Sequence, residues 1–315
     1  MRNRDPKKTF IGIIIILIVI GLIIGGIALF NYLNYKKTYD YKLGEIGYSK
    51  EEIKIISDKL SNALIDEIVM KEPYNKSIKD IITYKYFIND NLLRYLNYQK
   101  KEPSLNIDTI IRVVNVNGDY EPYTNVVDSK IEDGNLILVN KYHKLGENHE
   151  FTNLENISLM YAYSNNRLQE EAVTNFVRMA RAAKEEGLKI IANSSYRSYE
   201  EQDNIYNSFL KKHGTEYAEE YSAHAGYSEH ETGLAVDIDA YQSSADDFEN
   251  SNEYAWLLEN SYKYGYILRY PKDKEIITGY SYEPWHYRYV GIDAAKVIHD
   301  EDITFDEYYL YYVNK

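Results

Sequence analysis

Hydrophobic positions divide the chain into regions of different periodicity. From Phe10 to Phe30, 21 consecutive residues carry no charge, enough for a helix to cross about 30 Å of hydrocarbon. Between Tyr48 and Lys101, apolar residues recur at steps of three and four, as they do along one face of a helix. Beyond Ile107 the apolar runs are short and are separated by turn residues. The pattern predicts an apolar helix, then a helical region, then an α+β region.

Within the α+β region, helices and short strands alternate. Amphipathic spacing predicts helices over Asn165 to Glu186, over Glu200 to Lys212 and over Asn252 to Tyr264, each followed by a glycine that ends it. Runs rich in β-branched and aromatic residues predict strands. These runs are IIRVVNV, LILVN, LKIIANSS, LAVDI, GYILRYP, EIITGY and WHYRYV.

The charges near the apolar helix predict its orientation in the membrane. Residues 1–37 hold six Lys or Arg against one Asp, a net charge of +5, which leaves −18 for the remaining 278 residues. The basic residues before the apolar run favour a cytoplasmic N-terminus. An uncleaved anchor is preferred over a signal peptide, because ALFNYLNYKK offers no small-x-small cleavage site. The following chain then lies outside the cell, and its acidity argues against binding nucleic acid.

These observations predict four segments and a single-pass membrane protein. We expect a cytoplasmic tail at residues 1–9, a transmembrane anchor at 10–33, a helical stalk or N-terminal subdomain at 34–105 and the globular domain at 106–315.

Candidate metal ligands lie in the segment SEHETGLAVD. The chain has no cysteine, so a transition metal must be held by His, Asp or Glu. His230 does not begin the two-histidine zinc helix HExxH, because Leu234 stands where the second histidine would be. Asp237 lies on a short apolar strand, where an acid is costly without a cation. The sequence leaves open whether Asp237 binds a metal, pairs with an arginine such as Arg269, or accepts backbone hydrogen bonds.

A second candidate cluster lies in YEPWHYRYVG. His286 stands in an aromatic strand, where each ring nitrogen needs a partner. Two imidazoles and one carboxylate around Zn²⁺ leave a fourth position free, as in catalytic zinc sites. Glu283 is the candidate general base. An offset of three would place Glu283 and His286 on opposite faces of a regular strand, so we expect a bend near Pro284 that turns both inward.

A third motif, SSYRSYEEQ, places Arg197 between a predicted strand and a helix. The guanidinium group suits a carboxylate or a developing oxyanion, and this junction can project it into a cleft. Gln202, on the first turns of the helix, is positioned to hydrogen-bond a peptide group.

Taken together, the motifs resemble a known family. SxHxxGxAxD at Ser228 to Asp237, TGYxYEPWHYRYVG at Thr278 to Gly291 and SxYRSxxxQ at Ser194 to Gln202 are similar to those of VanY-type D-alanyl-D-alanine carboxypeptidases, which are zinc peptidases of bacterial cell-wall metabolism. The resemblance covers residues 113–290 approximately.

The resemblance implies a role for each matching position. His230, Asp237 and His286 match the family's ligands for one Zn²⁺ per chain, and Glu283 matches its catalytic base. Arg197 matches an arginine that stabilises substrate and transition state, whereas Gln202 and Ser228 match residues of the substrate pocket. The implied fold is the Hedgehog-like zinc peptidase fold, a small antiparallel sheet flanked by helices. The implied substrates are peptidoglycan stem peptides that end in D-Ala-D-Ala.

The sequence departs from the family before Ser228. The family commonly has proline-rich residues there, whereas this chain has Ala223-His224-Ala225-Gly226. We expect His224 to be a loop residue rather than a ligand. Three other functions stay open: a D,D-dipeptidase, an L,D-endopeptidase, and a zinc-stabilised wall-binding domain without turnover.

Overall fold

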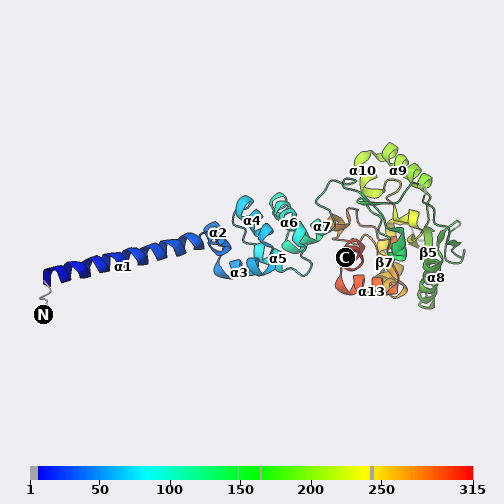
Figure 1. Cartoon of the computed structure of the whole chain (residues 1–315). Coiled ribbons are helices and arrows are strands. Elements are labelled where there is room, and N and C mark those ends of the chain that lie inside the picture. The colour runs from blue at the N-terminus through cyan, green and yellow to red at the C-terminus, as the bar shows by residue number, and fades with distance from the viewer. Residues whose placement is uncertain (1–5, 148, 164, 242–244, 315) are drawn as a thin grey trace. The chain divides into compact units, whose positions relative to one another are not determined.

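The computed structural model describes residues 6–147, 149–163, 165–241 and 245–314 (Figure 1). Contacts divide the chain into two compact units, Met1–Leu93 and Arg94–Lys315. Each unit is described by itself.

The first unit begins with the apolar helix α1 (Pro6–Tyr35). Its 30 residues extend about 45 Å at 1.5 Å per residue. The large apolar side chains from Phe10 to Phe30 that the structure describes are exposed; α1 is the blue helix of Figure 1. Ile13–Tyr35 is long and apolar enough to cross a membrane.

Short helices make up the rest of the first unit, in the region whose periodicity predicts them. Their apolar faces bury Leu43, Ile56, Ile68 and Ile81. Ser49 caps one helix through a reciprocal pair of hydrogen bonds with Glu52. The helices are α2 (Tyr39–Ile46), α3 (Lys50–Lys59), α4 (Asn62–Lys71), α5 (Ile78–Thr83), the 3-10 turn η1 (Asn89–Asn91) and α6 (Leu92–Lys101), which continues into the second unit.

The second unit combines a small sheet with helices, as the sequence predicts. Its helices are α7 (Ile107–Asn115), α8 (Glu170–Glu185), α9 (Tyr199–His213), α10 (Thr215–Tyr221), α11 (Asn252–Asn260), α12 (Glu275–Thr278), α13 (Ile292–Glu301) and α14 (Phe305–Tyr308). Single turns are η2 (Ile131–Leu136), η3 (Glu229–Thr232), η4 (Ala245–Asn250), η5 (Ser261–Tyr264) and η6 (Tyr309–Val313). Two short strand pairs lie outside the main sheet: β1 (Val127–Asp128) with β2 (His143–Lys144), and β3 (Leu154–Asn156) with β4 (Arg167–Gln169).

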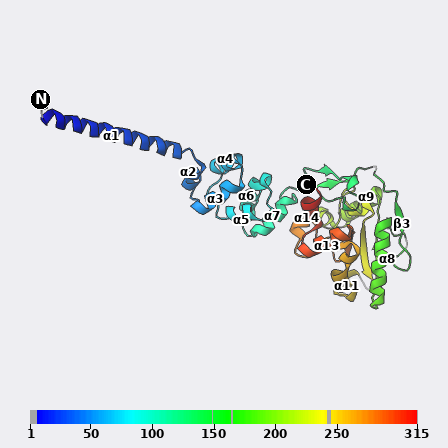
Figure 2. The same cartoon turned by 60° about the horizontal axis from the view of Figure 1, so that its bottom comes forward.

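The main sheet has four antiparallel strands in the order β5-β6-β8-β7. They are β5 (Ile190–Ser194), β6 (Ala235–Ala240), β8 (His286–Tyr289) and β7 (Tyr266–Leu268). Val236, Ile238 and Tyr287 are buried in one cluster with Phe176 and Met179 of α8, and α8 lies alongside the strands in Figures 1 and 2. Because side chains alternate along a strand, Asp237 is left on the opposite face.

Three predicted strands are wrong. IIRVVNV lies mostly in helix α7, whose Asn106 accepts a hydrogen bond from the Thr109 backbone N–H as an N-cap. EIITGY begins with helix α12, and Gly279 ends that helix in a left-handed conformation. LILVN follows the turn η2 and forms no strand beyond an isolated bridge at Asn140. In the first two segments, helix caps and tertiary packing outweigh the weak strand preference of β-branched residues.

Candidate active site

The register of the main sheet places Asp237 beside His286. Asp237, on the central strand β6, pairs with His286 at the start of β8 and with Ser194 at the end of β5. Directly opposed residues of antiparallel strands project to the same face. Two residues 49 positions apart in the sequence are thereby brought together by backbone pairing alone.

His230 reaches the same place from a single 3-10 turn. Ser228 and Glu231 cap the turn η3 reciprocally, and Gly233 ends it in a left-handed conformation with φ +69°. A Cβ atom on Gly233 would lie 2.5 Å from Leu154 Cδ2, so that side chain would have to shift, and the left-handed backbone itself favours glycine. His230 Nδ1 lies 2.7 Å from the Ser195 carbonyl oxygen and donates to it. This bond leaves Nε2 as an acceptor that faces the site, where the Arg197 guanidinium group lies 3.1 Å away.

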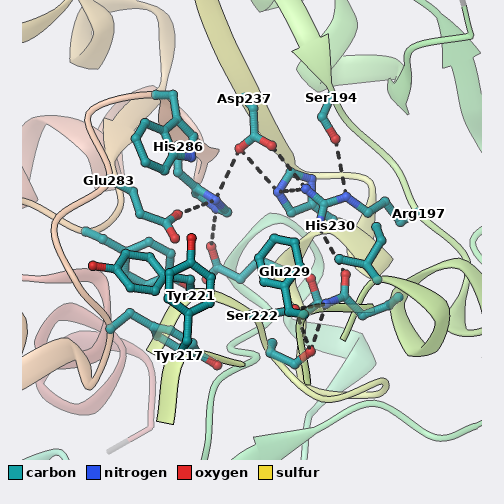
Figure 3. A pocket seen from close by; sticks show the side chains of 18 residues that line it. Ser194, Arg197, Tyr217, Tyr221, Ser222, Glu229, His230, Asp237, Glu283 and His286 are labelled. Carbon is teal, nitrogen blue, oxygen red and sulfur yellow. Dashed lines mark hydrogen bonds and ion pairs between the residues drawn. The ribbon is translucent and has the colours of Figure 1, made fainter. Parts of the chain in front are cut away.

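The three expected metal ligands converge. One ligand atom each from His230, Asp237 and His286 lies within 4.8 Å of the others. His230 Nε2 and His286 Nδ1 each lie 3.4 Å from Asp237 Oδ1. Dashed lines mark both contacts in Figure 3. Ligands about 2.0–2.1 Å from a tetrahedral Zn²⁺ are separated by about 3.4 Å. The two separations from Asp237 therefore match those of ligands that share one zinc ion.

Two further features of the cluster fit a cation. Asp237 Oδ1 is buried and has no hydrogen-bond partner among the residues that the structure describes, which is costly unless a cation is shared. Burial and the nearby Arg197 guanidinium lower the pKa of His230 to about 4, so its ring is neutral at pH 7. Although burial alone would raise the pKa of Asp237, the contacts with His230 and Arg197 hold it well below its usual range.

A buried carboxylate that the sequence analysis does not single out supports His286. Glu229 Oε2 lies 3.6 Å from His286 Nε2, and Glu229 Oε1 accepts hydrogen bonds from Arg269 and Arg288. Metal-binding histidines commonly direct their second ring nitrogen at such a carboxylate. Burial lowers the pKa of His286, but Glu229, Glu283 and Asp237 together raise it to about 9. Arg269 thus pairs with Glu229 and Asp306 rather than with Asp237.

Glu283 lies at the edge of the cluster. The chain turns at Pro284, with the His286 backbone N–H donating to the Glu283 carbonyl oxygen, so the expected bend is present. Glu283 Oε2 is 3.4 Å from His286 Nδ1, and the side chain is largely buried. A carboxylate here stands within reach of a water or substrate group between the ligands.

Arg197 lies on the other side of the cluster. Its Nη2 donates to Asp237 Oδ2 at 3.0 Å and lies 3.1 Å from His230 Nε2. Its Nε donates to Ser194 Oγ and its Nη1 to Gln202 Oε1. Arg197 is therefore held in one orientation by three neighbours, with its guanidinium group beside the candidate metal ligands.

The cluster lies in a pocket of about 400 Å³, within the roughly 300–1,000 Å³ range of small-ligand sites. Gln202 and Ser228 contribute to the lining, although both are almost completely buried. Tyr217 and Tyr221 on α10 form an aromatic wall facing the ligands (Figure 3). These two tyrosines cannot be singled out from the sequence, because nothing distinguishes them from the other 33 of its 35 tyrosines.

Known proteins share this part of the chain. The family described as "VanY: D-alanyl-D-alanine carboxypeptidase" matches residues 165–292. The bifunctional D-Ala-D-Ala dipeptidase and D-Ala-D-Ala carboxypeptidase VanXYC of Enterococcus gallinarum is 36% identical over 182 residues, which cover 56% of this chain and 94% of that protein. The chain belongs to the VanY family.

Other VanY-type relatives extend the comparison. A D-alanyl-D-alanine carboxypeptidase of Enterococcus faecium is 34% identical over 58% of this chain, and the match spans 60% of that relative's length. The solved structure of the LdcB LD-carboxypeptidase is 39% identical, has a TM-score of 0.55, and covers 59% of this chain and 90% of its own.

Proposed function

We propose that this VanY-family chain is a zinc-dependent D-alanyl-D-alanine carboxypeptidase that removes the terminal D-alanine from peptidoglycan stem peptides. The observation that carries the proposal is the convergence of His230, Asp237 and His286, with Glu283 beside them, in one pocket. Two histidines and one aspartate would hold Zn²⁺ and leave room for a reactant. Family membership supports the substrate class.

The side chains of the pocket divide the hydrolysis between them. When bound, Zn²⁺ would acidify water and polarise the scissile carbonyl group. Glu283 accepts a proton from the water that attacks the carbonyl carbon, and delivers it to the departing amine as the C–N bond breaks. Arg197 stabilises the negative charge of the substrate carboxylate or of the carbonyl oxygen in the transition state. Gln202 and Ser228 shape the pocket around the substrate.

Two related activities compete with this proposal. The Enterococcus gallinarum relative is named as both a dipeptidase and a carboxypeptidase, and the LdcB structure is that of an LD-carboxypeptidase. Product masses separate the three activities. A D,D-carboxypeptidase converts a pentapeptide to a tetrapeptide, an L,D-carboxypeptidase shortens a tetrapeptide, and a dipeptidase cleaves free D-Ala-D-Ala.

The proposal predicts turnover that depends on Glu283. The zinc-loaded chain should release D-alanine from a pentapeptide ending in D-Ala-D-Ala, measured by mass spectrometry. Glu283→Gln should lower kcat by roughly 10²- to 10⁴-fold, the usual contribution of a general base, while the bound zinc stays unchanged. Glu259→Gln, an exposed change on α11, should leave the rate unaffected.

Two results would exclude the proposed reaction. If the zinc-loaded chain does not shorten the pentapeptide, D,D-carboxypeptidase activity is excluded. If Glu283→Gln is fully active, Glu283 is not the general base. A wall-binding domain without turnover would give neither product nor any response to the Glu283 change.

We further propose that α1 anchors the chain in the cell membrane, with the N-terminus in the cytoplasm and the second unit outside. The support is the apolar length of α1 and the basic residues that precede it. Peptidoglycan lies outside the membrane, so this topology brings the pocket to the proposed substrate.

A further inference from the structure

His224, in the loop between α10 and η3, lies in a cluster of side chains. Its ring stacks parallel on Tyr123, with centroids 4.0 Å apart and planes 3° apart, and meets the edge of Tyr206 at 4.3 Å. Its Nε2 lies 2.8 Å from Glu219 Oε1, which also accepts a hydrogen bond from the Tyr206 hydroxyl. His224 is thus bound to Glu219 rather than to the three candidate metal ligands.

The partners of His224 are themselves fixed. Tyr123 adopts a left-handed backbone conformation with φ +60°, which is uncommon for a bulky residue and requires support from its surroundings. The Tyr123 backbone N–H donates to the Lys141 carbonyl oxygen, and Lys141 Nζ donates to the Glu219 carbonyl oxygen. We call Tyr123, Lys141, Tyr206, Glu219 and His224 the His224 cluster.

Charge favours the contact between His224 and Glu219. Burial alone would raise the pKa of Glu219, but hydrogen bonds from Tyr206 and His224 lower it below its usual value. Glu219 is therefore a carboxylate at neutral pH, and hydrogen bonds to a charged acceptor are the stronger kind.

A short chain of hydrogen bonds joins this loop to the candidate active site. Ala223, which immediately precedes His224, accepts a hydrogen bond at its carbonyl oxygen from Gln202 Nε2 at 2.8 Å. Gln202 Oε1 accepts from Arg197 Nη1 at 3.1 Å. Arg197 in turn donates to Asp237. The Ala223 carbonyl oxygen thus fixes the buried amide of Gln202, and that amide fixes one nitrogen of Arg197.

We propose that His224 is a positioning residue for Arg197. By binding Glu219 and stacking on Tyr123, it holds the Ala223 carbonyl where it orients Gln202, and Gln202 orients the guanidinium group. The inference rests on the proposed peptidase activity, in which Arg197 contacts the reacting groups.

A double-mutant cycle on the full, zinc-loaded chain tests the inference. We expect His224→Ala to lower kcat/KM for the pentapeptide roughly 10- to 100-fold, because small displacements of a positioning group have effects of this size. In the Gln202→Ala background the same change should lower kcat/KM less than about twofold, because the link is already broken. Zinc content should not change in any variant.

A remote histidine provides the matched control. His299 on α13 also stacks on a tyrosine, Tyr262, with centroids 3.8 Å apart, and lies beside a carboxylate, Asp300. His299→Ala should leave kcat/KM unchanged. Should His224→Ala fail to fold, His224→Phe keeps a ring against Tyr123 and removes only the bond to Glu219. The double-mutant cycle with Gln202→Ala is then measured with His224→Phe.

Two outcomes would overturn the inference. One is an equal loss of kcat/KM from His224→Ala with and without Gln202, which is the behaviour of a purely structural residue. The other is no loss at all.

A readout independent of turnover separates this inference from the proposed function. The Arg197 Nε–H resonance, identified by its loss in Arg197→Lys, should shift in His224→Ala and not in His299→Ala. An unshifted resonance contradicts the inference even if the enzyme is active. If the resonance shifts but the chain releases no D-alanine, the positioning role of His224 is supported and the proposed reaction is excluded.

Discussion

At the residue scale, the site depends on buried acids whose protonation is set by their neighbours. Glu229 faces two buried arginines, and its pKa stays well below the usual range although burial would raise it. Glu231, two residues later, accepts hydrogen bonds from Gly226 N–H and Ser228 N–H, and the Arg197 charge also favours its ionised form. Burial raises the pKa of Glu231 to about 7. Glu229 and Glu231, two acids of the same turn, thus differ in charge at mildly acidic pH.

The raised pKa of Glu231 predicts a pH-dependent stability. Between about pH 4.5 and 7 the folded chain holds a proton that the unfolded chain releases, so the free energy of unfolding falls as pH rises through this interval. Glu231→Gln keeps an acceptor and imitates the protonated acid. The free energy of unfolding of this variant, relative to that of wild type, should rise by roughly 1–3 kcal/mol from pH 5 to pH 8. Urea unfolding at both pH values measures it.

An exposed capping glutamate controls for the chemical change. Glu201 caps α9 as Glu231 caps η3, but it is exposed. Glu201→Gln should shift stability equally at pH 5 and pH 8. If Glu231→Gln and wild type differ by the same amount at both pH values, the buried acid is not titrating as described.

The candidate metal ligands and the candidate base are the residues of this pocket that the sequence already singles out. His230, Asp237, Glu283 and His286 stand out because imidazoles and acids in apolar strands need partners, and the structure brings all four together. Glu229 is not identified, because its function depends on Arg269 and Arg288, which reach it only in the folded chain. The aromatic wall of α10 depends on tertiary placement in the same way.

At the element scale, the turn η3 shows how one glycine supports the position of a candidate metal ligand. Gly233 ends the turn three residues after His230 in a left-handed conformation, and a Cβ there would meet Leu154. We expect Gly233→Ala to cost roughly 2–4 kcal/mol, from the left-handed backbone and from overpacking, and to weaken zinc binding. Thermal unfolding and a zinc competition titration measure the two effects.

Gly187 is the matched control for Gly233. It also has a left-handed backbone, with φ +84°, but open space where a Cβ would lie. Gly187→Ala should cost about 1–2 kcal/mol, the backbone penalty alone, and leave zinc affinity unchanged. Equal costs at the two positions would contradict the predicted contact with Leu154.

Elements are predictable where one local pattern dominates. The apolar face of α8 and the alternation of LAVDI in β6 agree with the structure, because burial on one face fixes both. The segments of α7 and α12 are rich in β-branched residues but are helical. In short apolar runs the two periodicities are hard to separate, and the neighbouring packing decides.

At the scale of the whole molecule, the apolar helix and the acidic second unit predict a membrane-bound enzyme. The full chain should sediment with membranes, resist extraction by salt and dissolve in detergent. Protease added outside intact protoplasts should digest the second unit. A mature N-terminus beginning after the apolar run would instead indicate a cleaved signal peptide, and protection from the protease would reverse the proposed topology.

The most direct test of the central claim is a zinc titration of the metal-free chain, followed by D-alanine release from a pentapeptide. Activity should rise linearly and reach its plateau at one Zn²⁺ per chain, whereas His230→Ala, Asp237→Ala and His286→Ala should show no such plateau. Full release of D-alanine by the metal-free chain, or an unchanged titration in those three variants, would contradict it.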